Sequence, residues 1–160
     1  MTNREKYNFD YFTISHYREL VQLAKDQGFQ FILHKDEFVP ARKDIIWRHD
    51  VEFSPDIALQ MAEIEYELGV RATYFFQMHS EFYNILERYM SDILRKLQSL
   101  GHHIGLHYDS HYYDVQDEET LERTIRQDKA YFEQVFGFEL DTFSFHETTP
   151  FILGCEKDQY

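Results

Sequence analysis

The 160-residue sequence has little cysteine, proline and glycine, and it has no long apolar run. Its single cysteine, Cys155, excludes a disulfide within the chain and fits a reducing compartment. Three prolines and six glycines leave few flexible joints, so we expect residues 1–160 to form a single domain. No apolar run approaches the length of about 18 residues that a membrane span needs. Residues 1–12 also lack the apolar core of a signal peptide, which predicts a cytoplasmic protein with no membrane insertion.

Positive charge is scarce as well. The chain has 16 lysines and arginines against 29 aspartates and glutamates, which gives a formal net charge of −13. This balance argues against binding to nucleic acid or to an anionic membrane. Apolar residues make up 43% of the chain, enough for a packed core, and aromatic residues make up 18%, which favours strands and pocket walls. Nine histidines are the unusual feature of what remains.

Apolar periodicity predicts helices that alternate with short strands. Four glycines, at positions 28, 69, 101 and 137, lie where the predicted helices end. The predicted helices cover residues 14–27, 55–68, 85–100 and 118–136, and the predicted strands cover 29–33, 44–50, 71–77, 104–108 and 140–145. Because this alternation requires parallel strand pairing through crossovers, the sequence predicts an α/β fold.

Two local patterns are specific. Ser54 is a good N-cap and Pro55 suits the first helical position, so the helix that begins here has the clearest start signal in the chain. The segment 44–50 is expected to be one buried strand that includes Ile46 and Trp47.

In parallel α/β folds the ligand site lies at the carboxyl ends of the strands. Five histidines fall at predicted strand ends: His49, His79, His107, His111 and His146. A solvated surface does not require such clustering, so these histidines are the candidates for a functional site.

A metal site is the hypothesis that the clustering favours. His107 and His111 have the spacing H-x-x-x-H, and Asp50 ends a neighbouring strand. Imidazole and carboxylate groups suit zinc and similar divalent ions, and three protein ligands leave a position for water, as in catalytic sites. The alternative interpretation is two surface histidines in a polar loop. His146 fits a ligand contact as well as a core position, and one of the histidines at 102 and 103 fits the carboxyl end of a helix as an imidazolium.

Two segments of the chain carry a family resemblance. The runs IIWRHDVEFSPDIALQMAEIEYELGVRATYFF and LGHHIGLHYDSH resemble the polysaccharide deacetylase (NodB-homology) family. They are most similar to a branch associated with surface-polysaccharide biosynthesis, in which R-H-D-V-D/E replaces the usual T-F-D-D. The likeness extends from about Tyr17 to the C-terminus. It implies a distorted (β/α) barrel with outer helices, a divalent metal, often zinc, held by one aspartate and two histidines, and removal of acetyl groups from N- or O-acetylated sugars.

The resemblance assigns roles to individual residues. GHHIGLHYDSH matches the family pattern G-H-E-I-G-x-H-x-x-x-H, which places His107 and His111 on the metal-binding histidines. Asp50 falls on the metal-binding aspartate and His49 on the catalytic base, where the family has a carboxylate. A neutral imidazole can still accept a proton, and Glu52 is the alternative base or ligand.

The last matching segment, FSFHETTP, lacks the arginine that the family has in this region. The resemblance implies that Arg48 and His146 contact the substrate. The family also continues beyond this point with further motifs, including its usual general acid, and barrels of this kind need about 200 residues or more. The chain is therefore either a shortened member or a piece of a longer one. We expect an incomplete barrel that lacks the C-terminal strands of the family and leaves an open sheet edge, which a homodimer could cover.

Two functions from different classes follow from these features. The first is a metal-dependent hydrolase that removes acetyl groups from a sugar or polysaccharide precursor, or a related amide or ester hydrolase on the same scaffold. The second is a catalytically impaired relative that binds carbohydrate or a partner protein. The histidine at the base position and the missing C-terminal motifs favour the second, whereas the metal-binding pattern favours the first.

Overall fold

The computed structural model describes residues 2, 6 and 13–155, so most of the N-terminal stretch analysed for a signal peptide lies outside the described residues. Helices and strands alternate along the described chain, as predicted. In order they are α2 (Ile14–Asp26), β1 (Gln30–Ile32), β2 (Asp44–Ile46), β3 (Arg48–Val51), α3 (Pro55–Glu67), β4 (Thr73–Phe76), α4 (Arg88–Ser99), β5 (His103–Asp109), α5 (Glu118–Phe136), β6 (Phe143–His146) and α6 (Pro150–Leu153).

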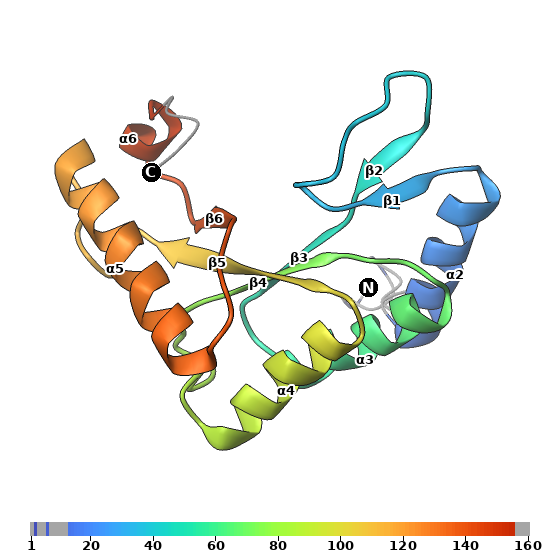
Figure 1. The fold of residues 1–160 in the computed structure, drawn as a ribbon, viewed down its shortest axis with the longest axis horizontal. Coiled ribbons are helices and arrows are strands. Elements are labelled where there is room, and N and C mark those ends of the chain that lie inside the picture. Colours follow the sequence, from blue (N-terminus) through green and yellow to red (C-terminus); the bar gives the residue numbers. More distant parts are fainter. Residues whose placement is uncertain (1, 3–5, 7–12, 156–160) are drawn as a thin grey trace.

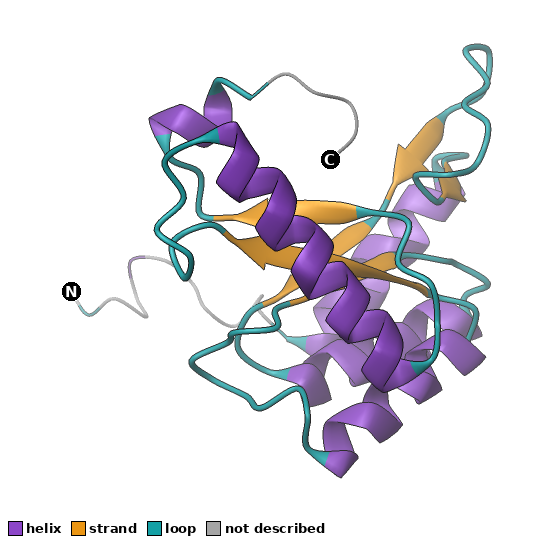
Figure 2. Cartoon of the chain, turned by 60° about the vertical axis from the view of Figure 1, so that its left-hand side comes forward, coloured by secondary structure: helices purple, strands orange, loops and turns teal. Residues whose placement is uncertain are grey.

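The main sheet has four parallel strands in the order β3-β4-β5-β6, the same order as in the chain. A separate sheet pairs β1 with β2, also in parallel. Helices α3, α4 and α5 connect successive strands of the main sheet and lie outside its curl (Figure 1), and α5 runs across the sheet in Figure 2. The predicted α/β class with parallel strands and outer helices is therefore confirmed. The described strands curl into half a barrel and do not close a full one.

Local signals set the helix ends as predicted. The Ser54 hydroxyl accepts a hydrogen bond from the Ile57 amide (3.3 Å), and Pro55 is the first residue of α3. Helix α5 covers the predicted range and ends at Gly137, whose φ of 77° lies in the left-handed region that favours glycine. Among the described helices none is long and apolar enough to span a membrane.

The segment 44–50 corrects one prediction. It forms two strands, β2 and β3, which belong to different sheets, because β2 pairs with β1 whereas β3 pairs with β4. The change of partner occurs at Trp47, whose carbonyl accepts a hydrogen bond from the Thr73 amide (3.0 Å). Ile46 is 46% exposed, so this segment is not the continuous buried strand that its composition predicts.

Two further boundaries differ. Helix α4 begins at Arg88 rather than at residue 85, because the Asn84 side chain accepts a hydrogen bond from the Leu86 amide (3.1 Å) and holds a turn there. Strand β6 covers Phe143–His146 rather than 140–145, which places His146 inside the strand.

The two faces of the main sheet have different contents. The face that packs against the helices carries the hydrophobic core, with buried Tyr74, Phe76 and Leu106. On the inner face of the curl, Asp50, Phe75 and Gly105 are paired across three strands. A Cβ atom on Gly105 would lie 2.5 Å from the Phe75 ring, so glycine is required where this ring crosses β5.

Candidate metal centre

Three strands of the main sheet deliver one polar side chain each to a common point at their carboxyl ends. Glu52 follows β3, His107 lies near the end of β5, and His146 ends β6. Glu52 Oε1 lies 3.3 Å from His107 Nε2 and 3.2 Å from His146 Nδ1. The three ligand atoms all lie within 4.8 Å of one another, so this cluster can hold a metal ion.

The imidazole of His107 is the most enclosed member of the cluster. Its side chain is 1% exposed, and its Nδ1 atom lies 2.8 Å from the hydroxyl of Ser144 on β6. Burial lowers the pKa of His107, although the negative charge of Asp50 opposes this effect, so the ring is neutral near pH 7. When Nδ1–H donates to Ser144, the Nε2 lone pair faces the Glu52 carboxylate. Two acceptors that face each other are satisfied by a cation and not by a hydrogen bond.

A cavity of about 740 Å³ opens beside the cluster and includes Glu52 and His146 in its lining. Aromatic rings form parts of its wall. Phe53 and Phe82, each at least 60% exposed, pack with ring centroids 4.5 Å apart. Exposed aromatic side chains at a cavity wall provide flat apolar surfaces for a ligand.

The backbone is strained at one edge of this cavity. Glu147, which follows His146 and lines the cavity, has a φ of 43°, in the left-handed region that non-glycine residues rarely adopt. Strain of this kind concentrates at functional sites. The observation therefore marks the same edge of the sheet as the Glu–His cluster does.

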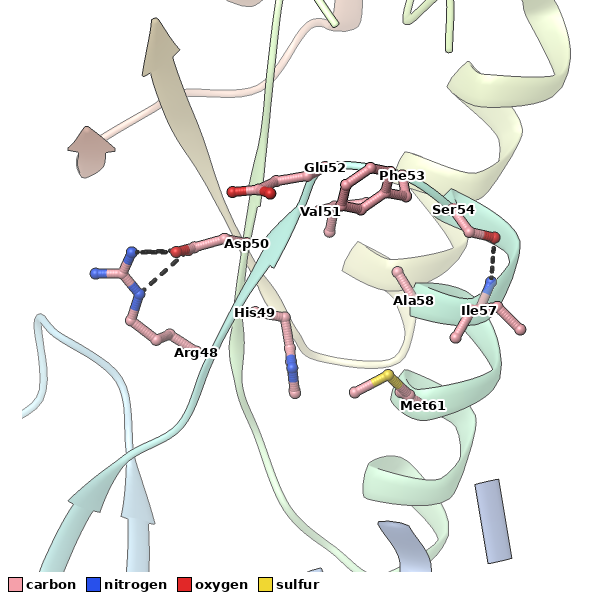
Figure 3. Close-up of a pocket in the computed structure, with 10 residues that line it drawn as sticks. All are labelled: Arg48, His49, Asp50, Val51, Glu52, Phe53, Ser54, Ile57, Ala58 and Met61. Carbon is pink, nitrogen blue, oxygen red and sulfur yellow. Dashed lines mark hydrogen bonds and ion pairs between the residues drawn. The ribbon is translucent and has the colours of Figure 1, made fainter. Parts of the chain in front are cut away.

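The metal ligands implied by the family resemblance are only partly brought together. His107 belongs to the cluster, whereas Asp50 is held by the guanidinium of Arg48, with N–O distances of 2.6 and 2.7 Å (Figure 3). The His111 side chain is half exposed, and its Nδ1 lies 3.6 Å from an oxygen of Asp109. It lines the cavity, but the structure groups His107 with Glu52 and His146 rather than with Asp50 and His111.

His49, the predicted base, lies on the opposite face of the sheet from Asp50 and Glu52. Successive side chains of a strand point to opposite faces, so Arg48 and Asp50 face the inner side while His49 faces α3 (Figure 3). His49 Nε2 lies 2.6 Å from Glu65 Oε1, and the ring takes no part in the cavity. The structure therefore does not bring His49, the predicted base, to the Glu–His cluster.

Glu65 is a buried ionisable residue that the sequence did not lead us to expect. Its side chain is fully buried, yet it accepts hydrogen bonds from the hydroxyls of Tyr17 and Tyr74 in addition to its contact with His49. Burial raises the pKa of Glu65, but these hydrogen bonds outweigh the effect and hold its pKa below the usual value. Its position one helical turn after the buried Ala62 was the available signal, because it places a carboxylate on the apolar face of α3.

His102 lies in the same region, and its surroundings differ from the predicted ones. The ring is buried rather than placed as an imidazolium at a helix end, and its two nitrogens contact the Ala62 carbonyl (2.9 Å) and the Ala72 amide (3.3 Å). Burial lowers the pKa of His102, against the opposing charge of Glu65. This histidine therefore links α3 to β4 in its neutral form.

Comparisons with family models, with curated proteins and with solved structures found no match for this chain. The resemblance to the deacetylase family therefore stays a prediction from the motifs. What the cluster can do chemically is decided by its own side chains.

Proposed function

We propose that this chain is a metal-dependent hydrolase that removes acetyl groups from an N- or O-acetylated sugar or polysaccharide precursor. The observation that carries the proposal is the convergence of Glu52, His107 and His146 beside a cavity with exposed aromatic walls. The motif resemblance supplies the reaction class. The cluster supplies a ligand set that such a reaction needs.

The geometry of the cluster suits zinc. Ligand atoms about 2.0–2.2 Å from a tetrahedral zinc ion lie about 3.3–3.6 Å from each other. The two distances from Glu52 Oε1 to the imidazole nitrogens, 3.2 and 3.3 Å, agree with this separation. Two imidazoles and one carboxylate are also a ligand set that catalytic zinc uses, with a fourth position left for water or substrate.

Residues around the cluster can accept a proton and contact the sugar. A divalent ion bound there would act as a Lewis acid toward water and the acetyl carbonyl. Because His49 faces α3, Asp50 is the carboxylate on the inner face that can accept a proton, and Arg48 fixes its orientation. Phe53 and Phe82 offer apolar surface to the faces of sugar rings.

The test combines metal binding with product release. We would measure zinc affinity by calorimetry and acetate release from N-acetylated and O-acetylated oligosaccharides, using metal-stripped protein reloaded with Zn²⁺. Glu52→Gln, His107→Ala and His146→Ala are each expected to lower zinc affinity more than about 100-fold, since even indirect supports of a ligand cost 10- to 100-fold. Glu63→Gln, which removes an exposed carboxylate on α3, is the matched control.

His111→Ala separates the two possible ligand sets. It should keep zinc affinity within a few-fold of the unmodified protein if Glu52, His107 and His146 are the ligands. Loss of affinity in His111→Ala with retention in His146→Ala would overturn this assignment in favour of the histidine pair implied by the motif. Absence of acetate release from every acetylated sugar would overturn the proposed activity.

A second candidate function is carbohydrate binding without hydrolysis. The ion pair between Arg48 and Asp50 favours it, because the guanidinium occupies both oxygens of the carboxylate that would have to accept the proton. In this case calorimetry would detect sugar binding in the zinc-loaded protein, and no acetate would form.

A further inference from the structure

A second polar group lies on the cavity wall and takes no part in the Glu–His cluster. His79 follows strand β4 and lines the cavity. Behind it, on helix α5, lies Asp128, which is 4% exposed. Tyr113, from the loop between β5 and α5, completes the group. A histidine at a cavity, supported by a buried carboxylate, is an arrangement typical of acid–base catalysis.

The hydrogen bonds of this group determine which ring nitrogen of His79 carries a hydrogen. The Tyr113 hydroxyl donates to Asp128 Oδ1 at 2.5 Å. His79 Nε2 lies 3.0 Å from the Tyr113 oxygen and 3.3 Å from Asp128 Oδ1. Because the Tyr113 proton is used toward Asp128, both atoms near Nε2 are acceptors, so Nε2 carries a hydrogen. The Nδ1 atom has no hydrogen bond to any of the described residues and is left as the nitrogen that can exchange a proton with a ligand.

Packing holds the ring in one orientation. The ring of Tyr112 stacks on His79 with centroids 3.6 Å apart and an angle of 3° between the planes. The Tyr113 ring meets His79 edge-on, at 5.5 Å and 87°. A ring held on one face and at one edge keeps little rotational freedom, which is what a positioned proton donor requires.

Asp128 depends on His79 for its charged contact. Asp128 is buried, and its second oxygen, Oδ2, has no hydrogen-bond partner among the described residues. A buried carboxylate is costly unless a positive charge lies close to it, and the one ion-pair partner that the described chain offers Asp128 is His79. Asp128 thus holds the Nε2 side of the His79 ring from behind, while Nδ1 belongs to a residue of the cavity wall.

We propose that His79 is the general acid of the hydrolysis, with Asp128 and Tyr113 as its positioning residues. This inference rests on the proposed function. As the oxygen of water bonds to the acetyl carbon, the bond from that carbon to the sugar nitrogen or oxygen breaks, and His79 gives its proton to the departing atom. Water supplies the replacement proton, so the overall reaction consumes one water and needs no other reactant.

The test compares two leaving groups. A sugar amine or alkoxide needs a proton to leave, whereas the nitrophenolate of 4-nitrophenyl acetate does not. In zinc-loaded protein, His79→Ala is expected to lower kcat/KM for an N-acetylated oligosaccharide by about 10²- to 10⁴-fold, the range for loss of a general acid. Its kcat/KM for 4-nitrophenyl acetate should stay within a few-fold, and its zinc affinity should not change. His16→Ala, on the outer helix α2, is the matched control.

A second measurement does not depend on activity. Nitrogen-15 NMR of the ring, assigned by loss of the signal in His79→Ala, is expected to show hydrogen on Nε2. Asp128→Asn, which keeps the shape of the side chain and removes its charge, should shift the nitrogen-15 signal of Nε2, because it changes the acceptor beside that atom. The groups that face this ring are Tyr112, Tyr113 and Asp128, and the other titratable groups of the cavity are Glu52, Glu81, Asp109, His111, His146 and Glu147.

The outcomes separate this inference from the proposed function. If the unmodified protein cleaves both substrates and His79→Ala lowers both rates equally, or neither, the general-acid role is wrong and the proposed activity stands. A ring that carries its hydrogen on Nδ1, or an Nε2 signal that is the same in Asp128→Asn, also overturns the role. If the unmodified protein releases acetate from neither substrate, both proposals fall together.

Discussion

The main sheet carries a glutamate–histidine cluster on each of its faces, and the two clusters differ in how far the glutamate is exposed. On the outer face, Glu65 meets His49 and is fully buried. On the inner face, Glu52 meets His107 and His146, and its side chain is 34% exposed beside a cavity. The residue types are the same, and the surroundings decide what each cluster can do.

Hydrogen bonding explains the difference. Both carboxylate oxygens of Glu65 have donors, because Tyr17 and His49 serve Oε1 and Tyr74 serves Oε2. Glu52 instead presents one oxygen to two imidazoles. A buried carboxylate whose two oxygens both have donors contributes to stability, whereas a partly exposed one between two imidazoles is available to a cation.

The largest effect is expected from Glu65→Ala. The substitution leaves two tyrosine hydroxyls and a histidine buried without their acceptor, so the free energy of unfolding should fall by about 3–5 kcal/mol. Urea unfolding, followed by the fluorescence of the single tryptophan, measures the change. Glu63→Ala on the same helix should stay within about 0.5 kcal/mol of the unmodified protein, because its side chain is exposed. Equal losses in the two variants would contradict the structural role of Glu65.

The next largest effect on stability is expected from zinc that binds to the inner cluster. Zinc at a free concentration 100 times its dissociation constant should raise the free energy of unfolding by about 2.7 kcal/mol, because it binds the folded chain. The increase should disappear in Glu52→Ala and persist in Glu63→Ala. Urea unfolding with added zinc, compared with added chelator, gives the measurement. An unchanged response in Glu52→Ala would show that zinc binds elsewhere.

Ser144→Ala should have a smaller effect on the same cluster. The hydroxyl lies 2.8 Å from His107 Nδ1 and orients the ring, and loss of such a support lowers metal affinity by about 10- to 100-fold. Calorimetric titration with Zn²⁺ measures the change, with Ser99→Ala on α4 as the control. Zinc affinity that equals that of the control would mean that Ser144 does not set the orientation of His107.

The smallest effect is expected from pH. Burial lowers the pKa of His102, so the unfolded chain binds more protons than the folded one once the pH falls below about 6.5. The free energy of unfolding should therefore decrease as the pH is lowered through this value. Urea unfolding between pH 8 and 5.5, with chelator present, checks the slope. His102→Gln should flatten it, and a free energy that rises toward low pH would contradict the sign.

The sequence predicted those parts of the fold that local chemistry controls. The start of α3 at Ser54 and the end of α5 at Gly137 depend on neighbouring residues alone, and both were predicted. The division of residues 44–50 into two strands was not predictable in this way, because it depends on which distant strand each half pairs with. Pairing partners are a tertiary property.

The sequence identified residues of the candidate site, but it did not predict which of them lie next to each other. His107 and His146 were named from strand ends and Glu52 as an alternative base or ligand. Which of the named residues meet depends on the curl of the sheet and on the loop that carries His111. His49 shows the limit most clearly. A shift of one residue along a strand exchanges its faces, so a correct strand assignment still left the side of this histidine open.

The surroundings of Asp50 depend on Gly105, a residue with no side chain. Its missing Cβ atom lets the Phe75 ring lie across β5, and that ring supports the guanidinium of Arg48 at 4.9 Å. Arg48 in turn neutralises Asp50. Enlarging position 105 to alanine would displace the ring, release the guanidinium and restore a free anion beside the inner cluster. Whether this carboxylate is paired or free is thus governed by steric room two strands away, so a methyl group can alter it while every polar residue remains in place.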